Sequence, residues 1–403
     1  MPARRGRSGG YGLDIELPHF LHYLLSERGT PRERCLLGLL VAAAITTLSL
    51  LAAQPSAAQA PRNGTGFGIS DSDDYVEQAM GYGFAALRPS TFRFIVPYNA
   101  VQDPALMERT AERIGLARSA GVREVVVTFG ARGGDSAETG FYRPSVDEWI
   151  SLVRQFMDRF DPEVDVWGPA NEPNAGVGWL GGAHGDGPRK LAGYYLALEA
   201  ELRIRGGHDK LLSPEFHDQY DGDLPDHRET RLLHGQDDPR SNLAHYLDHY
   251  VAAGGGFGDY LGWHPYSGVR RLSVASTEDL ISATPSGPPI WITEVGAVVS
   301  APRLGIQIDL HAQNAQVRFI VDRLSQLPRV ARVSYWHMIN LTPGWDSALL
   351  ESDGKPRPAW YTWCAAAHGG AGCDYGSPVA PPPAEEGGHE LIRGLNGGPW
   401  ALS

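Results

Sequence analysis

The chain of 403 residues is long enough for one large domain with flanking tails. Its apolar content of 42% and charged content of 20% are typical of a globular protein that buries a sizeable core. The formal net charge of -12 argues against nucleic acid as a partner, because phosphate binding needs a basic surface.

The first 60 residues predict an export signal. Residues 1–34 are basic and irregular, and an uncharged apolar run follows at 35–53. An A-x-A sequence ending at Ala60 completes the order of a secretory signal peptide, which is removed from the mature protein. The apolar run is also long enough to cross a bilayer uncleaved, so a membrane anchor over 35–53 is the alternative. In either case we expect the body, residues 61–375, to be exported and secreted or held at the membrane.

Eight short apolar runs in the body predict eight strands. Most of them are continuous apolar stretches without alternation, as expected of parallel strands that are covered on both faces. The predicted strands are Gly66–Ile69, Phe92–Val96, Glu124–Phe129, Val164–Trp167, Lys210–Ser213, Tyr260–His264, Ile290–Thr293 and Val333–His337.

Helical patterns separate these runs. A capping box at Ser145–Glu148 opens one helix, and Gly121 ends another that covers Ala105–Ala120. Further helices are predicted at Leu191–Arg205, Ala312–Leu327 and Ala359–Ala367. This alternation predicts an α/β fold, a (β/α)8 TIM barrel with one catalytic domain over residues 61–375. The alternative is an open doubly wound sheet, but the chain has no glycine-rich phosphate-binding fingerprint.

Two glutamates each follow a predicted strand. Glu172 comes after the fourth strand and Glu294 after the seventh. Taken singly, such residues are commonly helix caps or loop surface. Because barrel enzymes carry their chemistry at the C-terminal ends of the strands, we expect these two carboxyl groups to face one another there. A pair of carboxyl groups is what cleavage of a glycosidic bond requires.

Two segments carry a resemblance to a known family. Trp167–Asn174 reads Trp-x-x-x-Asn-Glu-Pro-Asn, and Ile292–Gly296 reads Ile-Thr-Glu-x-Gly. In this order, together with the segment Ser334–Trp360, they resemble the clan A retaining glycoside hydrolases, most closely bacterial members of families 39 and 5. The resemblance extends over about residues 66–363.

The resemblance implies a role for each matching residue. Glu172 would be the general acid and then the general base, and Glu294 would be the nucleophile, with the carboxyl groups ~5–5.5 Å apart. Asn171 would bind the sugar 2-hydroxyl, and Tyr266 would donate to Glu294. The remaining substrate-site residues would be His264, the stacking platform Trp336 and the buried cation Arg93. We expect Arg93 and Tyr266 to keep Glu294 ionised, and an apolar environment to keep Glu172 protonated.

The implied activity is hydrolysis of O-glycosidic bonds in a β-linked glycan, with carbohydrate as the partner and no cofactor. The first alternative is a barrel that binds carbohydrate without turnover. The second is a metal-dependent hydrolase, which would need His and Asp ligands converging at strand ends. No metal is expected, since His245 and His249 share a helix turn but lack the glutamate of a zinc-protease motif.

The C-terminal part predicts a disulfide and a tail. Cys364 and Cys373 are the two cysteines of the mature chain, and in an exported protein they suggest one small disulfide, although two free thiols are the alternative. Proline and glycine dominate residues 376–403, which predicts a disordered tail.

Overall fold

The computed structural model describes residues 65–72, 83–135, 140–174, 180, 186–218, 242–302, 305–339, 344–369 and 373. The chain divides into two units, Met1–Ala57 and Ala58–Ser403, and all described residues belong to the second. The expected signal segment and the tail therefore lie outside the described residues, as do residues 219–241. Among the described residues, no helix has the length and apolar character to cross a membrane.

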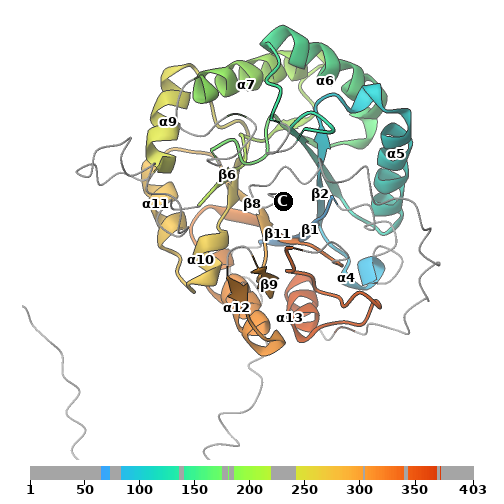
Figure 1. Ribbon diagram of the computed structural model, residues 1–403, viewed down its shortest axis with the longest axis vertical. Coiled ribbons are helices and arrows are strands. Elements are labelled where there is room, and N and C mark those ends of the chain that lie inside the picture. The colour runs from blue at the N-terminus through green and yellow to red at the C-terminus, as the bar shows by residue number, and fades with distance from the viewer. Residues whose placement is uncertain are drawn as a thin grey trace, which may run out of the picture. The chain divides into compact units, whose positions relative to one another are not determined.

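The centre of the fold is a curled sheet of nine strands, joined side by side in parallel (Figure 1). Its strand order is β5-β4-β3-β2-β1-β11-β8-β7-β6. The strands are β1 (Gly66–Ser70), β2 (Thr91–Pro97), β3 (Glu124–Gly130), β4 (Val166–Gly168), β5 (Lys210–Leu211), β6 (Phe216–His217), β7 (Leu261–His264), β8 (Ile290–Val295) and β11 (Val330–Trp336). Each of the eight strands expected from the sequence overlaps one of them.

The hydrogen-bonded sheet is open, with β5 and β6 at its two ends. Both of these short strands come from one stretch of chain, residues 210–217. Isolated bridges connect this stretch to both sides, between Glu215 and Asn171 and between Leu212 and Tyr260. One continuous segment thus lies between β4 and β7, although regular pairing is interrupted within it. A second, two-stranded antiparallel sheet consists of β9 (Ser300–Ala301) and β10 (Ile306–Gln307).

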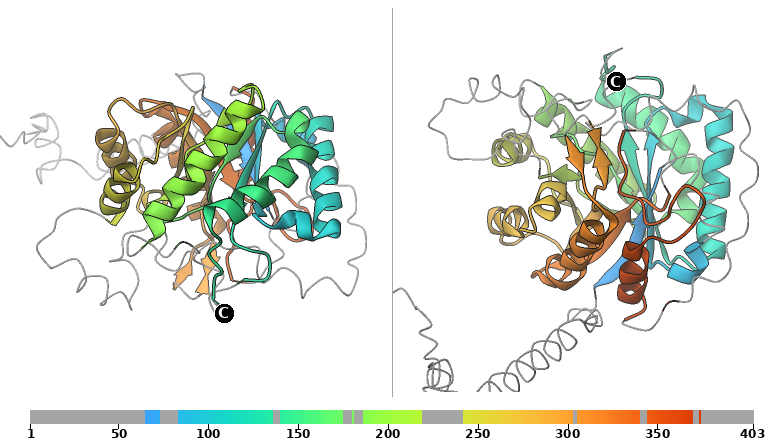
Figure 2. Two further views of the ribbon diagram at one scale, coloured as in Figure 1. Left: turned by 90° about the horizontal axis from the view of Figure 1, so that it is seen from above. Right: turned by 60° about the horizontal axis from the view of Figure 1, so that its bottom comes forward.

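Helices surround the outer face of the curled sheet (Figures 1 and 2). The α-helices are α4 (Ala85–Leu87), α5 (Pro104–Ser119), α6 (Val146–Phe160), α7 (Gly187–Ile204), α9 (Asn242–Ala252), α10 (Tyr266–Arg270), α11 (Ala275–Ala283), α12 (Leu310–Asp322) and α13 (Pro358–Ala367). Short 3-10 turns occur at η2 (Ala100–Gln102), η3 (Asp161–Glu163) and η6 (Leu324–Gln326).

Local sequence explains where these helices begin. The Ser145 hydroxyl accepts a hydrogen bond from the Glu148 N–H at the start of α6, and the Asp103 carboxylate caps α5 in front of Pro104. The apolar face of α6 then packs on the sheet, where Trp149 meets Phe129 edge-on with ring centroids 5.7 Å apart.

The inner side of the sheet has a small apolar cluster of its own. Its buried members come from four places around the curl: Val126, Val166, Leu212 and Trp291. Because these side chains fill the interior below, polar side chains farther along the strands are left to gather at the C-terminal ends.

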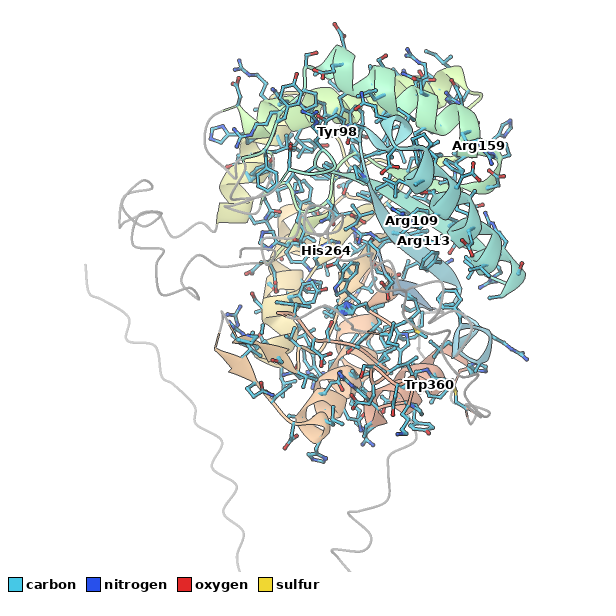
Figure 3. The ribbon with its side chains drawn as sticks, turned by 45° about the vertical axis from the view of Figure 1, so that its right-hand side comes forward. Tyr98, Arg109, Arg113, Arg159, His264 and Trp360 are labelled. Atoms are coloured by element: carbon cyan, nitrogen blue, oxygen red, sulfur yellow. A yellow bond between two sulfur atoms is a disulfide. The ribbon has the colours of Figure 1, made fainter. Side chains whose placement is uncertain are left out.

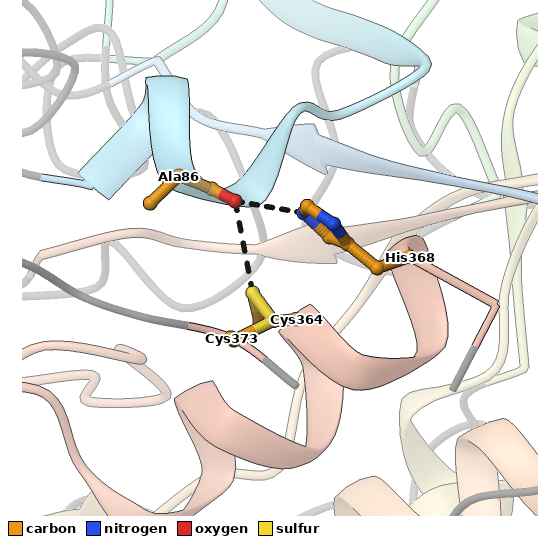
Figure 4. Close-up of a disulfide and its surroundings, with 4 residues drawn as sticks. All are labelled: Ala86, Cys364, His368 and Cys373. Carbon is orange, nitrogen blue, oxygen red and sulfur yellow. Dashed lines mark hydrogen bonds between the residues drawn. A yellow bond between two sulfur atoms is a disulfide. The ribbon is translucent and has the colours of Figure 1, made fainter. Parts of the chain in front are cut away.

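A disulfide joins Cys364 of α13 to Cys373 (Figure 4). Close to it, His368 Nε2 donates a 2.8 Å hydrogen bond to the carbonyl oxygen of Ala86 in α4. These contacts hold the end of the last helix beside the first described helix.

Candidate active site

Glu172 lies directly after β4 and is almost completely buried. Its backbone φ of 42° is in the left-handed region, which is uncommon for a residue other than glycine. Its N–H donates to the carbonyl oxygen of Glu215, 2.9 Å away, and this contact helps to hold the turn. Strained backbone of this kind gathers at functional sites, where the surrounding structure compensates for it.

Glu294 lies near the end of β8 and is buried as well. Arg93 Nη1 donates to its Oε2 at 2.7 Å, and the Tyr266 hydroxyl donates to its Oε1 at 2.9 Å. Both oxygens of this carboxyl group therefore have a donor within the protein.

His264, at the end of β7, lies beside the two glutamates. In Figure 3 it is found toward the middle of the fold, whereas Arg159 of α6 lies at the periphery. One oxygen each of Glu172 and Glu294 and one ring nitrogen of His264 lie within 4.8 Å of one another. The strand ends thus bring the two sequence-predicted glutamates face to face.

The ring of His264 is a fixed neutral group. Its Nδ1 is 2.9 Å from Glu172 Oε1, and its Nε2 is 3.0 Å from the Thr293 hydroxyl. Burial lowers the pKa of His264 to about 4, so the imidazole is uncharged near neutral pH. Which nitrogen carries the proton depends on whether Glu172 is protonated, because one of the two groups must donate.

Arg93 connects most of the site. Its five N–H groups have acceptors in Glu215 (both oxygens), Ser70, Asn171 and Glu294. Asn171, for which the resemblance implied a contact with the sugar 2-hydroxyl, accepts from Arg93 Nη2 through its Oδ1 at 2.6 Å. Its amide group is thereby oriented by the arginine.

Glu215 is a site residue that the sequence analysis did not identify. It is completely buried and forms an ion pair with Arg93. Like Glu172 and Glu294, Glu215 is an acidic residue close behind a predicted strand, since it follows Lys210–Ser213 by two residues. No motif surrounds it, so it did not stand out.

Burial is the largest influence on the pKa values of the two facing carboxyl groups. It raises the pKa of Glu172, in line with a proton-donating role. It also raises the pKa of Glu294, and Arg93 and the Tyr266 hydroxyl counter that effect only in part. The expectation that Arg93 and Tyr266 favour the ionised form of Glu294 holds for their own effects on its pKa, but the effect of burial is larger. Burial and the adjacent carboxylates raise the pKa of Tyr266 well above its usual value, so its hydroxyl remains a donor.

Two tryptophans lie at the same end of the sheet. Trp336 is the last residue of β11 and is mostly buried, and its carbonyl oxygen accepts from the Ser347 hydroxyl. Trp345 is partly exposed and meets the ring of Tyr266 edge-on, with centroids 5.4 Å apart. The ring of Trp345 thus lies against Tyr266, the residue whose hydroxyl donates to Glu294.

The metal-dependent alternative must be weighed against this geometry. Glu172, His264 and Glu294 are spaced closely enough for their atoms to share a cation. However, Arg93 donates to one oxygen of Glu294 and the Tyr266 hydroxyl donates to the other, so a metal ion would have to compete with a hydrogen-bond donor at either oxygen. A second group of possible ligands, Cys364, His368 and Cys373, has its sulfurs in a disulfide, so they are not thiolate ligands.

No protein-family model matches the chain, and no curated protein matches it in sequence. Solved structures do match. A GH5_18 protein from Streptomyces cattleya in complex with Manb1-4GlcNAc is 15% identical with a TM-score of 0.54, over 79% of this chain and 83% of that chain.

Two further solved structures are similar to this chain. The beta-glycosidase BGL167 is 12% identical with a TM-score of 0.53, over 80% of this chain and 99% of that one. The GH53 catalytic domain of Ignisphaera aggregans is 12% identical with a TM-score of 0.51, over 76% of this chain and 98% of that one. The fold of this chain is TIM-barrel-like. At these identities the likeness concerns the fold.

Proposed function

We propose that the chain is a retaining glycoside hydrolase that cleaves O-glycosidic bonds of a β-linked glycan by double displacement. Glu172 is the acid/base and Glu294 the nucleophile. The observation that carries the proposal is that an oxygen of each carboxyl group lies within 4.8 Å of the other. A retaining mechanism needs carboxyl groups about 5–5.5 Å apart, whereas an inverting one needs roughly 6.5–9.5 Å to admit a water molecule.

In the first displacement, a Glu294 oxygen attacks the anomeric carbon and the bond from that carbon to the leaving oxygen breaks. Glu172 gives its proton to the leaving oxygen, which departs as a hydroxyl group. The buried environment that raises the pKa of Glu172 keeps this proton in place before attack.

In the second displacement, Glu172 acts as the base. Formation of the glycosyl ester removes the charge of Glu294, so the proton affinity of Glu172 falls. Glu172 then takes a proton from water, the water oxygen attacks the anomeric carbon, and Glu294 leaves as a carboxylate. Two displacements on one carbon retain its configuration.

The substrate class rests on two supports. The resemblance of the Asn171–Pro173 and Ile292–Gly296 segments to retaining glycoside hydrolases implies a β-linked glycan. The structurally similar GH5_18 protein was solved with Manb1-4GlcNAc bound, which is a β-linked disaccharide. Tyr266 and Trp345 add an aromatic surface of the kind that packs on sugar faces.

The test is hydrolysis of a panel of aryl β-glycosides and polysaccharides by the wild type, Glu172→Gln and Glu294→Gln. We expect Glu294→Gln to be inactive and Glu172→Gln to retain activity only on substrates whose leaving groups need no proton. Glu201→Gln is the matched control, because Glu201 is a buried glutamate of α7 whose arginine partners, Arg154 and Arg205, do not contact the site glutamates. Wild-type rates for both site variants would refute the proposal.

Two additional outcomes separate the alternatives. Activity that persists in a chelator, with retained anomeric configuration by NMR, is expected of a two-carboxylate enzyme, whereas loss of activity in chelator would favour a metal-dependent hydrolase. Binding of a glycan without any turnover would instead favour a non-catalytic carbohydrate-binding barrel.

We also propose that the curled sheet is a closed (β/α)8 barrel in solution, with residues 210–217 as its fifth strand. The bridges of Leu212 and Glu215 to opposite sides of the sheet support this.

Export is proposed as well, through the segment 1–60 as a cleaved signal or through 35–53 as an anchor. The Cys364–Cys373 disulfide fits an oxidising compartment. N-terminal sequencing of the mature protein distinguishes the two export routes.

A further inference from the structure

Glu215 has no part in the two displacements, yet it is the most enclosed acidic group at the site. It lies on the stretch between β5 and β6 and is completely buried. Its Oε1 accepts from Arg93 Nε at 3.1 Å, and its Oε2 pairs with Arg93 Nη2. This side-on pairing of a carboxylate with a guanidinium is the most directional ion pair that proteins form.

The side-on pair determines where the rest of Arg93 points. A guanidinium is planar, so two contacts along one edge set the directions of its remaining N–H groups. Nη1 is directed to Ser70 and to Glu294 Oε2, at 3.0 and 2.7 Å. The hydrogen bond to Glu294 therefore depends on the carboxylate on the opposite edge.

The same pair determines how much positive charge Glu294 meets. Glu215 and Glu294 share one guanidinium, so ionised they leave one net negative charge on the three groups. Without Glu215, the full charge of Arg93 would act on Glu294. The other titratable groups that act on the two facing carboxyl groups are His217, Asp218, His264 and Tyr266. Asp71 and His337, which follow β1 and β11, are buried as well.

We propose that Glu215 is a positioning residue that aims Arg93 and offsets its charge, so that Glu294 remains a strong nucleophile and Glu172 retains its proton. The proposal rests on the function proposed above and assigns a role to a third glutamate of that site.

The pKa shifts of Arg93 and Glu172 agree with this role of Glu215. Burial lowers the pKa of Arg93, but the carboxylates of Glu215 and Glu294 outweigh burial and raise it overall. Burial raises the pKa of Glu172 first of all, and the negative charge of Glu215 raises it further. Removing the charge of Glu215 should therefore lower the pKa of Glu172. The pKa of Glu294 should fall as well, because Arg93, which already lowers it, would act on it with its full charge.

The test is the pH profile of kcat/KM for Glu215→Gln, which has nearly the same shape without the charge. The acidic limb reports ionisation of Glu294 and the basic limb reports loss of the Glu172 proton. We expect both limbs to move to lower pH by about one unit, since a charge within a few ångströms shifts a pKa by roughly 1–3 units. We also expect kcat to fall by about 10-fold or more while KM changes little, because charge-assisted hydrogen bonds are the strong ones.

A direct measurement does not depend on turnover. Carbon-13 labelling of glutamate side chains allows the Glu294 carboxyl to be titrated by NMR, with its signal assigned by its absence in Glu294→Gln. We expect a lower midpoint in Glu215→Gln than in the wild type. Glu201→Gln, which removes another buried and arginine-paired carboxylate, should leave both the midpoint and the pH profile unchanged.

A second variant covers the case in which Glu215→Gln does not fold. Glu215→Asp retains the charge but reaches less far, so we expect wild-type pH limbs with a lowered kcat. Wild-type limbs, midpoint and kcat in Glu215→Gln, or wild-type kcat in Glu215→Asp, would overturn the proposal. The role of Glu215 can fail while the proposed hydrolase function stands, provided that Glu294→Gln is inactive in the same series. An active Glu294→Gln would refute the hydrolase function itself.

Discussion

The hydroxyl of Tyr266 acts on Glu294 through one short hydrogen bond. Arg93 contacts the other oxygen of the same carboxyl group, so the two donors divide the carboxylate between them. Both lower the pKa of Glu294, in opposition to burial. Glu172, by contrast, has the neutral ring of His264 as its side-chain neighbour. At the scale of single residues, the site thus gives two chemically identical carboxyl groups different partners.

This difference predicts the effect of Tyr266→Phe. Removing a hydrogen bond to a charged group costs about 1.5–3 kcal/mol, so we expect kcat to fall by about 10- to 100-fold. Because the hydroxyl stabilises the ionised carboxylate, the pKa of Glu294 should rise and the acidic limb of the kcat/KM profile should move to higher pH. That direction is opposite to the one expected for Glu215→Gln. An acidic limb that stays in place would contradict the role given to Tyr266.

At the scale of elements, the site residues lie on the strands or directly after them, and the helices pack against the outer face of the sheet that these strands form. α6 illustrates how strongly local sequence acts. Ser145 caps its first turn, Asp147 and Glu148 place negative charge there, and Arg159 lies in its last turn. Its buried face then packs on β3 and β4. Capping and amphipathic spacing therefore agree with the packing that the fold requires.

The cap can be tested separately from the packing. Ser145→Ala removes the acceptor for the Glu148 N–H, and we expect a loss of about 1 kcal/mol in the free energy of unfolding. Urea denaturation followed by circular dichroism measures this. The control is Ser151→Ala, an exposed position within the same helix, where alanine favours the helix and no loss is expected. Equal losses at both positions would argue against the cap.

At the scale of the whole molecule, the stretch 210–217 decides how the curled sheet is completed. Its regular pairing reaches β4 on one side and β7 on the other. Leu212, in its middle, is completely buried in the inner cluster beside Val126, Val166 and Trp291. The same stretch carries Glu215, so the segment that fills the gap between the sheet's ends also supplies the partner of Arg93.

Leu212→Ala tests this part of the fold. Truncation of a buried leucine costs about 2–5 kcal/mol, since it removes apolar contacts and leaves a cavity. We expect a loss in that range by denaturant unfolding. Leu196→Ala, at an exposed position on α7, is the control and should change stability by less than about 0.5 kcal/mol. A loss at Leu212 no greater than at Leu196 would mean that this stretch contributes little to the core.

The sequence alone determined the order of strands and helices and the position of two glutamates at strand ends. These are local properties, because apolar runs, caps and helix stops express themselves over a few residues. The motifs around Glu172 and Glu294 are local as well. Helix ends were less well determined: α12 stops at Asp322, five residues before the expected end, and continues as the 3-10 turn η6.

Tertiary structure alone decided which polar groups meet. The Arg93–Glu215 pair joins residues 122 positions apart, and the His264–Glu172 contact spans 92 positions. Such pairs depend on how the sheet curls and on which side of each strand faces inward, and no local pattern encodes either. The upward shift in the pKa of Glu294 was decided in the same way, because burial is a property of the assembled fold and here outweighs the hydrogen bonds from Arg93 and Tyr266.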